Sequence, residues 1–199
     1  MCGRFYIDDD TMAEIVKIVR KIDSKKAKTG DIYPSEPAMV LRADHREIVA
    51  EVMNWGYNSN LQGSKLMINA RSETVQERPM FRKDYEIHRC VVPANKFYEW
   101  KKLNGMSKEK YDFFVPEQIL YLAGIYQKTP EGDRFTILTK AAEGCMQEIH
   151  HRMPVIIQAE QTEKWLYSKE DAVKLLLEHC DALQRIKSTE DEYEQMSLF

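Results

Sequence analysis

The first periodic segment of the chain predicts an amphipathic helix over residues 10–22. Thr11 and Glu14 have the spacing of a capping box at its start, and the Lys-rich stretch 25–30 follows its end. The apolar residues that recur at helical spacing are Met12, Ile15, Val16, Val19 and Ile22.

Short runs rich in β-branched and aromatic residues dominate the middle of the chain and predict strands. Turn-forming pieces such as Asn58-Ser59-Asn60 and 129–133 separate them. The predicted strands are 38–41, 48–54, 65–68, 89–92, 96–100, 119–126, 135–140 and 154–158. Two helices follow, one over 159–166 and one from the N-cap Ser168 to about residue 180.

Many short strands, few helices and no βαβ rhythm predict an α+β fold. We expect a single domain over 1–185, with a mainly antiparallel, barrel-like sheet and a few flanking helices. Residues 186–199 are polar and acidic and predict a flexible tail.

The composition narrows the class of protein. The 199 residues carry a net charge of −3, and four acidic residues lie between positions 190 and 194, so a DNA ligand needs a local basic face. No apolar run approaches the roughly 20 residues of a membrane span, and no signal peptide precedes the domain, so we expect a cytoplasmic, nucleoid-associated protein. The four cysteines lack CxxC spacing, so we expect no metal and no cofactor.

The chain begins Met1-Cys2-Gly3, and cysteine is small enough for the initiator methionine to be removed. Removal leaves an α-amine with a pKa of about 8 and a thiol with a pKa of about 8.5 on one residue. The amine can condense with an aldehyde to an imine, and the thiol can then close a thiazolidine ring on the imine carbon. Taken alone, Cys2 also fits an ordinary small residue at a frayed terminus.

A second segment, 68–74, alternates polar groups along a predicted strand end. Asn69, Arg71 and Glu73 share one face there. Arg71 can hold a phosphate through two parallel hydrogen bonds, and Asn69 can hydrogen-bond a sugar oxygen. An ordinary solvated strand end is the alternative.

Two further segments carry ionisable groups among apolar residues. Glu99 lies in the strand 96–100, and an apolar environment raises the pKa of a carboxyl group toward that of a general acid or base. Tyr98 and Trp100 face the opposite side of that strand. His150 is followed by His151 and Arg152, and a histidine beside an arginine suits proton transfer near a phosphate. The alternatives are a core strand and a structural histidine.

As an ordered set, these segments resemble the SRAP domain family (SOS response-associated peptidase), whose members process abasic sites. The family pattern opens with Met-Cys-Gly-Arg, found at 1–4. Its Asn-Ala-Arg-x-Glu-Thr lies at 69–74, its Pro-Ala-(Asp/Asn)-Gly-Phe-Tyr-Glu-Trp at 93–100 and its His-x-Arg-Met-Pro at 150–154. The chain departs from the pattern at Lys96, where the family has glycine, and we expect an altered turn or an added phosphate contact there.

The resemblance implies an activity and a role for each matched residue. Cys2 crosslinks covalently, as a thiazolidine, to abasic sites in single-stranded DNA and shields them, with self-reversal and AP-lyase activity. Asn69 positions Cys2 and the opened deoxyribose, Glu99 is the acid/base, and His150 helps to open the sugar ring. The implied DNA contacts are Arg4, Trp55, Arg71 and Arg152, with Trp55 favoured over Trp100 for stacking. The name peptidase corresponds to removal of Met1 by the chain itself, although an aminopeptidase can also remove it.

The last five residues, 195–199, resemble the pentapeptide Gln-Leu-Ser/Asp-Leu-Phe that binds the bacterial DNA sliding clamp. Leu198 and Phe199 would fill an apolar pocket, and Gln195 would donate or accept a hydrogen bond. The clamp is therefore an expected partner of the tail. A random apolar end is the alternative.

Two other functions remain open from the sequence. An amidohydrolase with an N-terminal cysteine also begins Met-Cys-Gly, but such enzymes usually continue with isoleucine and lack the segments at 69–74 and 150–154. A non-catalytic module that binds single-stranded DNA or the clamp would have Cys2 only incidentally. It would bind intact single strands and form no covalent product with abasic ones.

Overall fold

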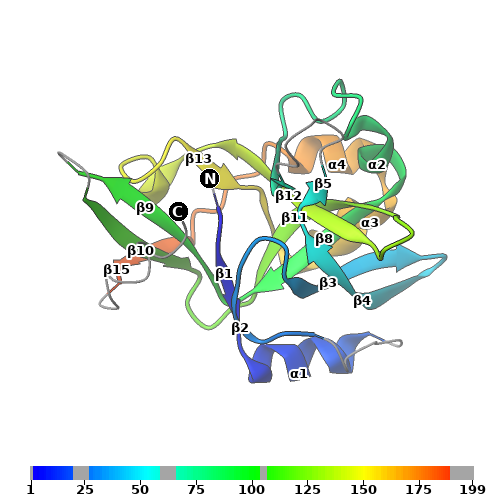
Figure 1. The fold of residues 1–199 in the computed structure, drawn as a ribbon, viewed down its shortest axis with the longest axis horizontal. Helices are drawn as coiled ribbons and strands as arrows, with labels where there is room; N and C mark the ends of the chain where they lie inside the picture. The colour runs from blue at the N-terminus through cyan, green and yellow to red at the C-terminus, as the bar shows by residue number, and fades with distance from the viewer. Residues whose placement is uncertain (1, 20–26, 59–65, 104–106, 189–199) are drawn as a thin grey trace.

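The computed structural model describes residues 2–19, 27–58, 66–103 and 107–188. Within them, the strands form two large sheets that lie side by side, with one short hairpin beside the larger sheet (Figure 1). The larger sheet closes into a barrel, and all but two of its strand pairings are antiparallel. The predicted α+β class with a barrel-like sheet is therefore confirmed.

The barrel is a ring of β3, β4, β12, β11 and β8, in which each strand pairs with the next, and three shorter strands pair with members of the ring. The bounds of its strands are β3 Pro37–Asp44, β4 Glu47–Trp55, β7 Asn69–Arg71, β8 Arg89–Ala94, β11 Leu120–Gln127, β12 Arg134–Ala141, β13 Arg152–Pro154 and β14 Ile156–Ile157. β3 forms a hairpin with β4, β8 lies against β3, β11 against β8, and β12 pairs with both β11 and β4, which closes the ring. Three shorter strands extend it, since β7 and β13 pair with β12 and β14 pairs with β11.

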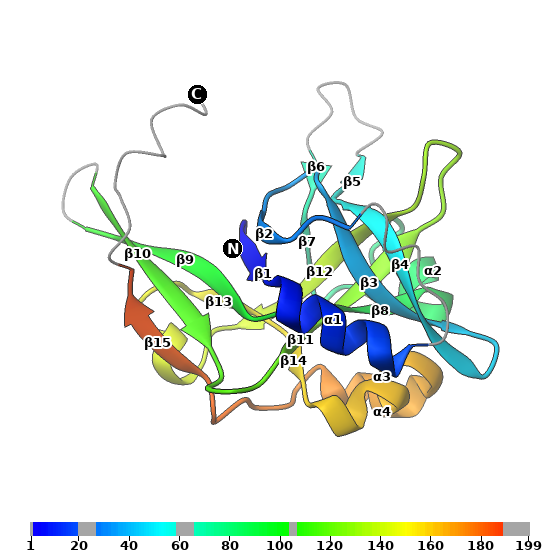
Figure 2. The ribbon, with the colours of Figure 1, turned by 90° about the horizontal axis from the view of Figure 1, so that it is seen from below.

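The second sheet holds the first strand of the chain. Its strands are β1 Phe5–Ile7, β2 Gly30–Ile32, β9 Lys96–Lys102, β10 Lys108–Phe114 and β15 Gln184–Lys187, and the separate hairpin is β5 Tyr57–Asn58 with β6 Leu66–Met67. The order is β15-β10-β9-β1-β2, with antiparallel neighbours. β1 lies between β9 and β2, and in both ribbon views β9, β10 and β15 lie on one side of it and the barrel on the other (Figures 1 and 2). The chain thus enters the molecule between two sheets.

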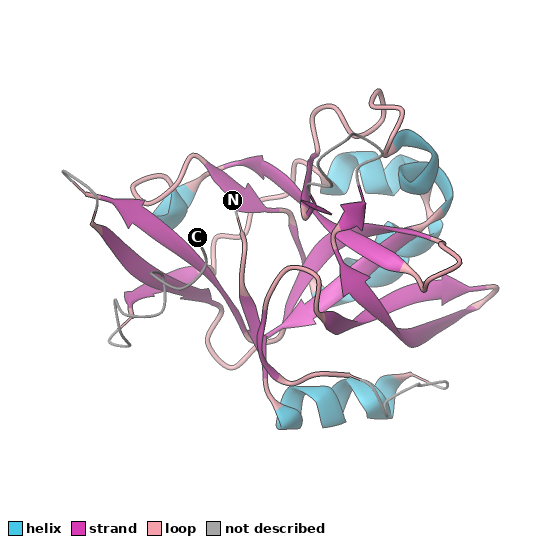
Figure 3. Ribbon diagram, viewed as in Figure 1, coloured by secondary structure: helices cyan, strands magenta, loops and turns pink. Residues whose placement is uncertain are grey.

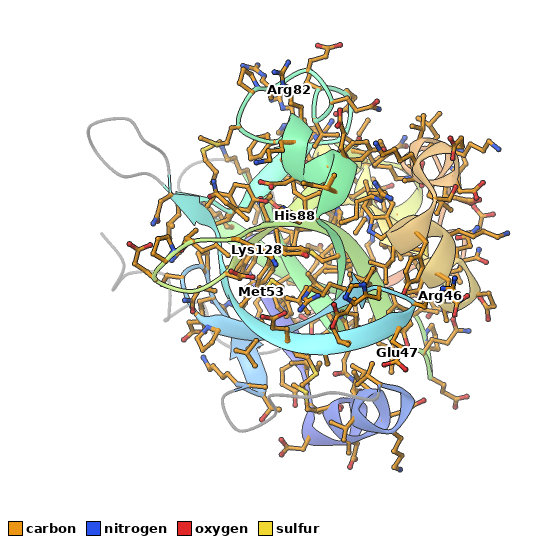
Figure 4. All side chains as sticks on the ribbon, turned by 90° about the vertical axis from the view of Figure 1, so that its right-hand side faces the viewer. Arg46, Glu47, Met53, Arg82, His88 and Lys128 are labelled. Carbon is orange, nitrogen blue, oxygen red and sulfur yellow. The ribbon has the colours of Figure 1, made fainter. Side chains whose placement is uncertain are left out.

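Helices cover the outside of the sheets. Their bounds are α1 Asp9–Ile18, α2 Arg82–Ile87, α3 Thr162–Tyr167 and α4 Lys169–Leu175, with single 3₁₀ turns at Gly144–Met146 and Ala159–Gln161. Figure 3 shows α2, α3 and α4 grouped beside the barrel, while α1 crosses its lower edge. Figure 4 faces the barrel side, with His88 at the C-terminal end of α2, where its Nδ1 lies 2.8 Å from the Asp84 carboxylate one turn earlier.

The structure corrects the predicted helix boundaries. The first helix is capped by Asp8, whose carboxylate accepts a hydrogen bond from the Thr11 amide at 2.7 Å, so the predicted capping box at Thr11 is wrong. This helix ends at Ile18, and residues 20–22 of the predicted range lie outside the described residues. The predicted cap at Ser168 is confirmed by its hydrogen bond with the Asp171 amide, but the helix ends at Leu175 rather than near residue 180.

The second sheet extends to the end of the described chain. Residues 186 and 187 belong to β15, which pairs with β10, so strand structure continues past residue 185. The clamp-like segment 195–199 lies outside the described residues. No helix in the described part of the chain is long and apolar enough to cross a membrane.

Candidate active site

The N-terminal segment is held by strand pairing with β9. Phe5 lies opposite Phe97, and the Tyr98 amide donates to the Arg4 carbonyl at 3.0 Å. Continuing this antiparallel register places Gly3 opposite Glu99. Glu99 therefore lies beside the first residues of the chain. Cys2 itself is buried, with 1% of its surface exposed.

Asn69 approaches Cys2 from the barrel. Its backbone is fixed by parallel pairing with β12, where Asn69 lies opposite Ile137. Its side-chain nitrogen donates to the Cys2 carbonyl at 2.9 Å. Its side-chain oxygen is buried and has no hydrogen-bond partner among the described residues. An acceptor of this kind is suited to a ligand hydroxyl, because a buried polar atom gains from a partner.

His150 enters the site from the segment before β13. Its Nδ1 lies 3.0 Å from the backbone nitrogen of Arg152 and 3.1 Å from the Arg152 carbonyl oxygen. The ring also stacks on His151 with centroids 4.4 Å apart, and His151 is exposed. Because the Arg152 backbone hydrogen-bonds Nδ1, Nε2 is the ring nitrogen that we consider for proton transfer with a substrate.

Electrostatic interactions link Cys2, Glu99 and His150. Burial raises the pKa of the Cys2 thiol far above its usual value, and the Glu99 carboxylate raises it further. Burial lowers the pKa of His150, while the same carboxylate opposes that shift. At neutral pH the thiol is therefore protonated and the imidazole is neutral. A reaction at Cys2 needs a base for the thiol proton, and Glu99, which acts on both groups, is the candidate.

Arg4 lies in an aromatic environment, on the strand face that carries Tyr98 and Trp100. Its guanidinium carbon lies 4.6, 5.5 and 5.3 Å from the ring centroids of Tyr33, Tyr98 and Trp100. Asp31 forms an ion pair with it at 3.5 Å. Arg4 is 7% exposed, so it is a mostly buried cation at the edge of the site.

The two other arginines expected to contact DNA lie in different environments. Arg71 is exposed at the end of β7, two residues beyond Asn69, and its position suits a phosphate contact. Arg152 is 8% exposed and its guanidinium is bound by the Glu73 carboxylate at 2.5 and 2.8 Å. The structure therefore places Arg152 in an internal ion pair. Its predicted phosphate contact stays a prediction.

The expectation that Trp55 stacks on DNA needs correction. Its side chain has no exposed surface, because it packs against Phe5 and Phe135 with ring centroids 5.2 and 6.2 Å away. Its indole nitrogen donates to the Ile68 carbonyl at 2.9 Å. Trp55 is a core residue, whereas Trp100 is only half-buried.

Lys96, which replaces a glycine of the family pattern, adopts an ordinary strand conformation. It pairs with Phe114 and Tyr6 in regular register, so the strand that carries Glu99 is regular from its first residue. Its amine forms an ion pair with Asp112 at 2.7 Å. Asp112 is therefore a charge partner of Lys96 in the structure, and the expected phosphate contact of this lysine is left to experiment.

Two features beside the site were not predicted from the sequence. Glu73 occupies the glutamate position of the motif at 69–74. Its ion-pair partner Arg152 is 79 residues away, and no local sequence pattern links the two. Asp31 and Tyr33 surround Arg4 from β2 and the turn after it, in a segment without any motif. Among the described residues, no three His, Cys, Asp or Glu side chains come together as a metal site.

Comparison with known proteins identifies the family of this chain. The sequence pattern described as SOS response associated peptidase (SRAP) matches residues 1–193. The chain belongs to the SRAP family. "Abasic site processing protein YoqW" of Bacillus subtilis is 33% identical over 198 residues, covering 92% of this chain and 88% of that protein. "Abasic site processing protein YedK" of Escherichia coli is 24% identical over 176 residues, covering 83% and 79%.

Solved structures share the fold of this SRAP chain. A protein from Bacteroides thetaiotaomicron superposes with a TM-score of 0.79 at 22% identity, covering 94% of this chain and 91% of that one. A phage-related protein from Bordetella bronchiseptica gives a TM-score of 0.78 at 23% identity, with 95% of each chain covered. The overall fold is thus common to these proteins.

Proposed function

We propose that this protein bonds covalently to abasic sites in single-stranded DNA through Cys2, once Met1 has been removed. The observation that carries the proposal is the convergence of Asn69, Glu99 and His150 on the first residues of the chain. The names of the SRAP relatives support abasic-site processing as the reaction class. A stacked duplex would hide the sugar, so the substrate is single-stranded.

The chemistry needs both reactive groups of Cys2. The α-amine adds to the aldehyde carbon of the ring-opened sugar, and the resulting carbinolamine loses water to give an imine. The thiol sulfur then bonds to the imine carbon, and the thiol proton moves to the nitrogen. The net reaction joins aldehyde and cysteine into a thiazolidine and releases one water. Because burial keeps the thiol protonated, Glu99 receives its proton during ring closure and passes it to the nitrogen.

The other site residues act around this sequence. His150 presents Nε2 to the sugar and moves the proton that opens its ring. Asn69 holds the Cys2 carbonyl and offers its side-chain oxygen to a sugar hydroxyl. The exposed Arg71 contacts a flanking phosphate, and Arg4, which is mostly buried and paired with Asp31, adds positive charge at the edge of the site. Reopening of the thiazolidine to the imine permits hydrolysis back to aldehyde, or β-elimination at the 3′ phosphate as a lyase.

A denaturing gel with a single-stranded abasic oligonucleotide tests the proposal. Wild type and Cys145→Ala should both give a slower band whose mass equals protein plus oligonucleotide minus water. Cys2→Ala should give none, and neither should protein that retains Met1. Cys2→Ser keeps the amine, so borohydride should trap its imine. The absence of any covalent product from the wild type would overturn the proposal and favour a non-catalytic binding module.

We also propose that residues 195–199 bind the bacterial sliding clamp. The support is their match to the clamp-binding pentapeptide and the acidic stretch before them, which favours an extended segment. The test is calorimetric titration of a bacterial clamp with full-length protein and with the variant Leu198→Ala/Phe199→Ala. Equal affinities, or no heat from the wild type, would refute this interaction. A control variant, Met196→Ala, should bind as the wild type does.

A further inference from the structure

We propose that Glu73 is a positioning residue for His150 and acts through Arg152. This role concerns the same site, and its effect on the crosslinking rate rests on the proposed function. Its geometry is independent of that function. Glu73 belongs to the turn after β7, and Arg152 begins β13, so their ion pair joins the two segments that supply Asn69 and His150.

The ion pair uses both carboxylate oxygens. Nη1 of Arg152 donates to Oε1 of Glu73 at 2.5 Å, and Nη2 donates to Oε2 at 2.8 Å. The Arg152 side chain is 10% exposed and that of Glu73 48%. Hydrogen bonding to Arg152 lowers the pKa of Glu73, so the carboxylate remains charged at neutral pH. This is the bidentate geometry that fixes a guanidinium in orientation as well as position.

Arg152 is tied to the barrel as well. Nη2 also donates to the Thr139 carbonyl on β12. The same carbonyl accepts from the Ser72 amide at 2.8 Å, directly beside Glu73 in sequence. One oxygen of β12 therefore connects the turn after β7 with the Arg152 side chain. Of the hydrogen bonds that the guanidinium makes within the described residues, removal of the Glu73 carboxylate would leave those to Thr139.

The backbone of Arg152 can hydrogen-bond Nδ1 of His150 whether the ring is neutral or charged. When the ring is neutral, the Arg152 amide donates to Nδ1 at 3.0 Å, which places the proton on Nε2. When the ring is charged, Nδ1–H can donate to the Arg152 carbonyl at 3.1 Å. The ring thus keeps one orientation in either state. A shift of Arg152 weakens both contacts and lets the ring turn or change tautomer.

Arg152 held in this way differs from a phosphate ligand. A carboxylate that occupies both donors of the guanidinium fork excludes bidentate phosphate binding at the same donors. If Glu73 instead only withheld Arg152 from DNA, its neutralisation would free the arginine and tighten binding. The two roles of Glu73 therefore predict different effects of its neutralisation on affinity for an intact strand: no change if Glu73 positions His150, and tighter binding if it only withholds Arg152.

The kinetic test compares Glu73→Gln and Glu73→Ala with a matched control, Glu51→Gln. Glu51 forms a similar ion pair with Arg42 on the β3–β4 hairpin, away from Cys2. We expect the single-turnover crosslinking rate to fall about tenfold in Glu73→Ala, and less in Glu73→Gln, at unchanged affinity for an intact single strand. The control should keep the wild-type rate. Tighter binding with an unchanged rate would overturn the proposal.

A second measurement needs no reaction. Nitrogen-15 chemical shifts of the His150 ring report its tautomer above its pKa, and the wild type should show the proton on Nε2. Glu73→Ala should show a mixture of tautomers, whereas Glu51→Gln should match the wild type. If the wild type forms no crosslink, the proposed function fails, yet this spectrum still decides the role of Glu73. A wild-type tautomer and rate in Glu73→Ala would refute that role.

Discussion

The side-chain amide of Asn69 donates to the backbone carbonyl of Cys2 at 2.9 Å, which joins β7 to the first residues of the chain. Asn69 is 8% exposed, and its backbone is fixed by pairing with Ile137 on β12. A strand of the barrel thereby sets where Cys2 lies relative to Glu99. Orientation of this kind contributes to rate because the reacting groups are held together in advance.

Replacement of Asn69 by alanine should remove that orientation. We expect the crosslinking rate with abasic single strands to fall about five- to tenfold, as the lost hydrogen bond costs about 1–1.5 kcal/mol. Single-turnover gels measure the rate, and circular dichroism in urea checks that the fold persists. Asn58→Ala, at an exposed strand residue, is the control. A rate in Asn69→Ala equal to that of this control would contradict the role of Asn69.

Replacement of Trp55 should mainly lower the stability of the fold, whereas replacement of Trp100 should mainly weaken DNA binding. Trp55→Ala removes a fully buried side chain and should lower the free energy of unfolding by about 3–5 kcal/mol. Trp100→Ala removes a half-buried ring that lies over Arg4, and should weaken binding to intact single strands while costing less stability. Urea unfolding and fluorescence anisotropy measure the two effects. Comparable stability losses in both variants would refute this distinction.

The strands that the sequence predicts are those with apolar side chains on both faces or in continuous runs. β8 and β11 are almost wholly buried and were recognisable from their Val, Ile and Leu residues. β10 was not, because it starts Lys-Glu-Lys and only one of its residues is fully buried. β1 and β15 are short, and β15 is a polar edge strand, so their pairing depends on distant partners that no local pattern reveals.

From the sequence, the residues of the site could be grouped only because their motifs occur in the order of the SRAP family pattern. Glu99 and Asn69 were identifiable by residue type and spacing, yet their approach to Cys2 depends on strand register across the fold. Trp55 was misjudged because a tryptophan followed by glycine carries no information on burial. Its neighbours Phe5 and Phe135 come from distant parts of the sequence.

Lys96 should behave as a structural cation. Lys96→Met keeps the aliphatic stem but leaves Asp112 without its ion pair, so we expect stability to fall by about 1 kcal/mol or less. Affinity for single strands should stay unchanged, because the amine is already paired. The exposed Lys102→Met provides a control for the general loss of one positive charge. A drop in affinity larger than that of Lys102→Met would show that Lys96 contacts phosphate.

Lowering the pH should reduce the free energy of unfolding, because the unfolded chain binds a proton at His150 more readily than the folded one does. Burial lowers the folded-state pKa of this ring below the value of about 6.5 expected when the chain is unfolded. Between those two pKa values the unfolded state binds more protons, so the free energy of unfolding rises with pH across that window and falls as pH drops from 7 to 5.

His150→Gln cannot take up this proton, so part of the loss between pH 7 and pH 5 should disappear in the variant. Urea unfolding at the two pH values measures the difference. The exposed His151→Gln, next in sequence, should lose as much stability as the wild type. If His150→Gln and His151→Gln lost stability equally, the lowered pKa of the half-buried His150 would be excluded, and with it the neutral ring on which its proposed role depends.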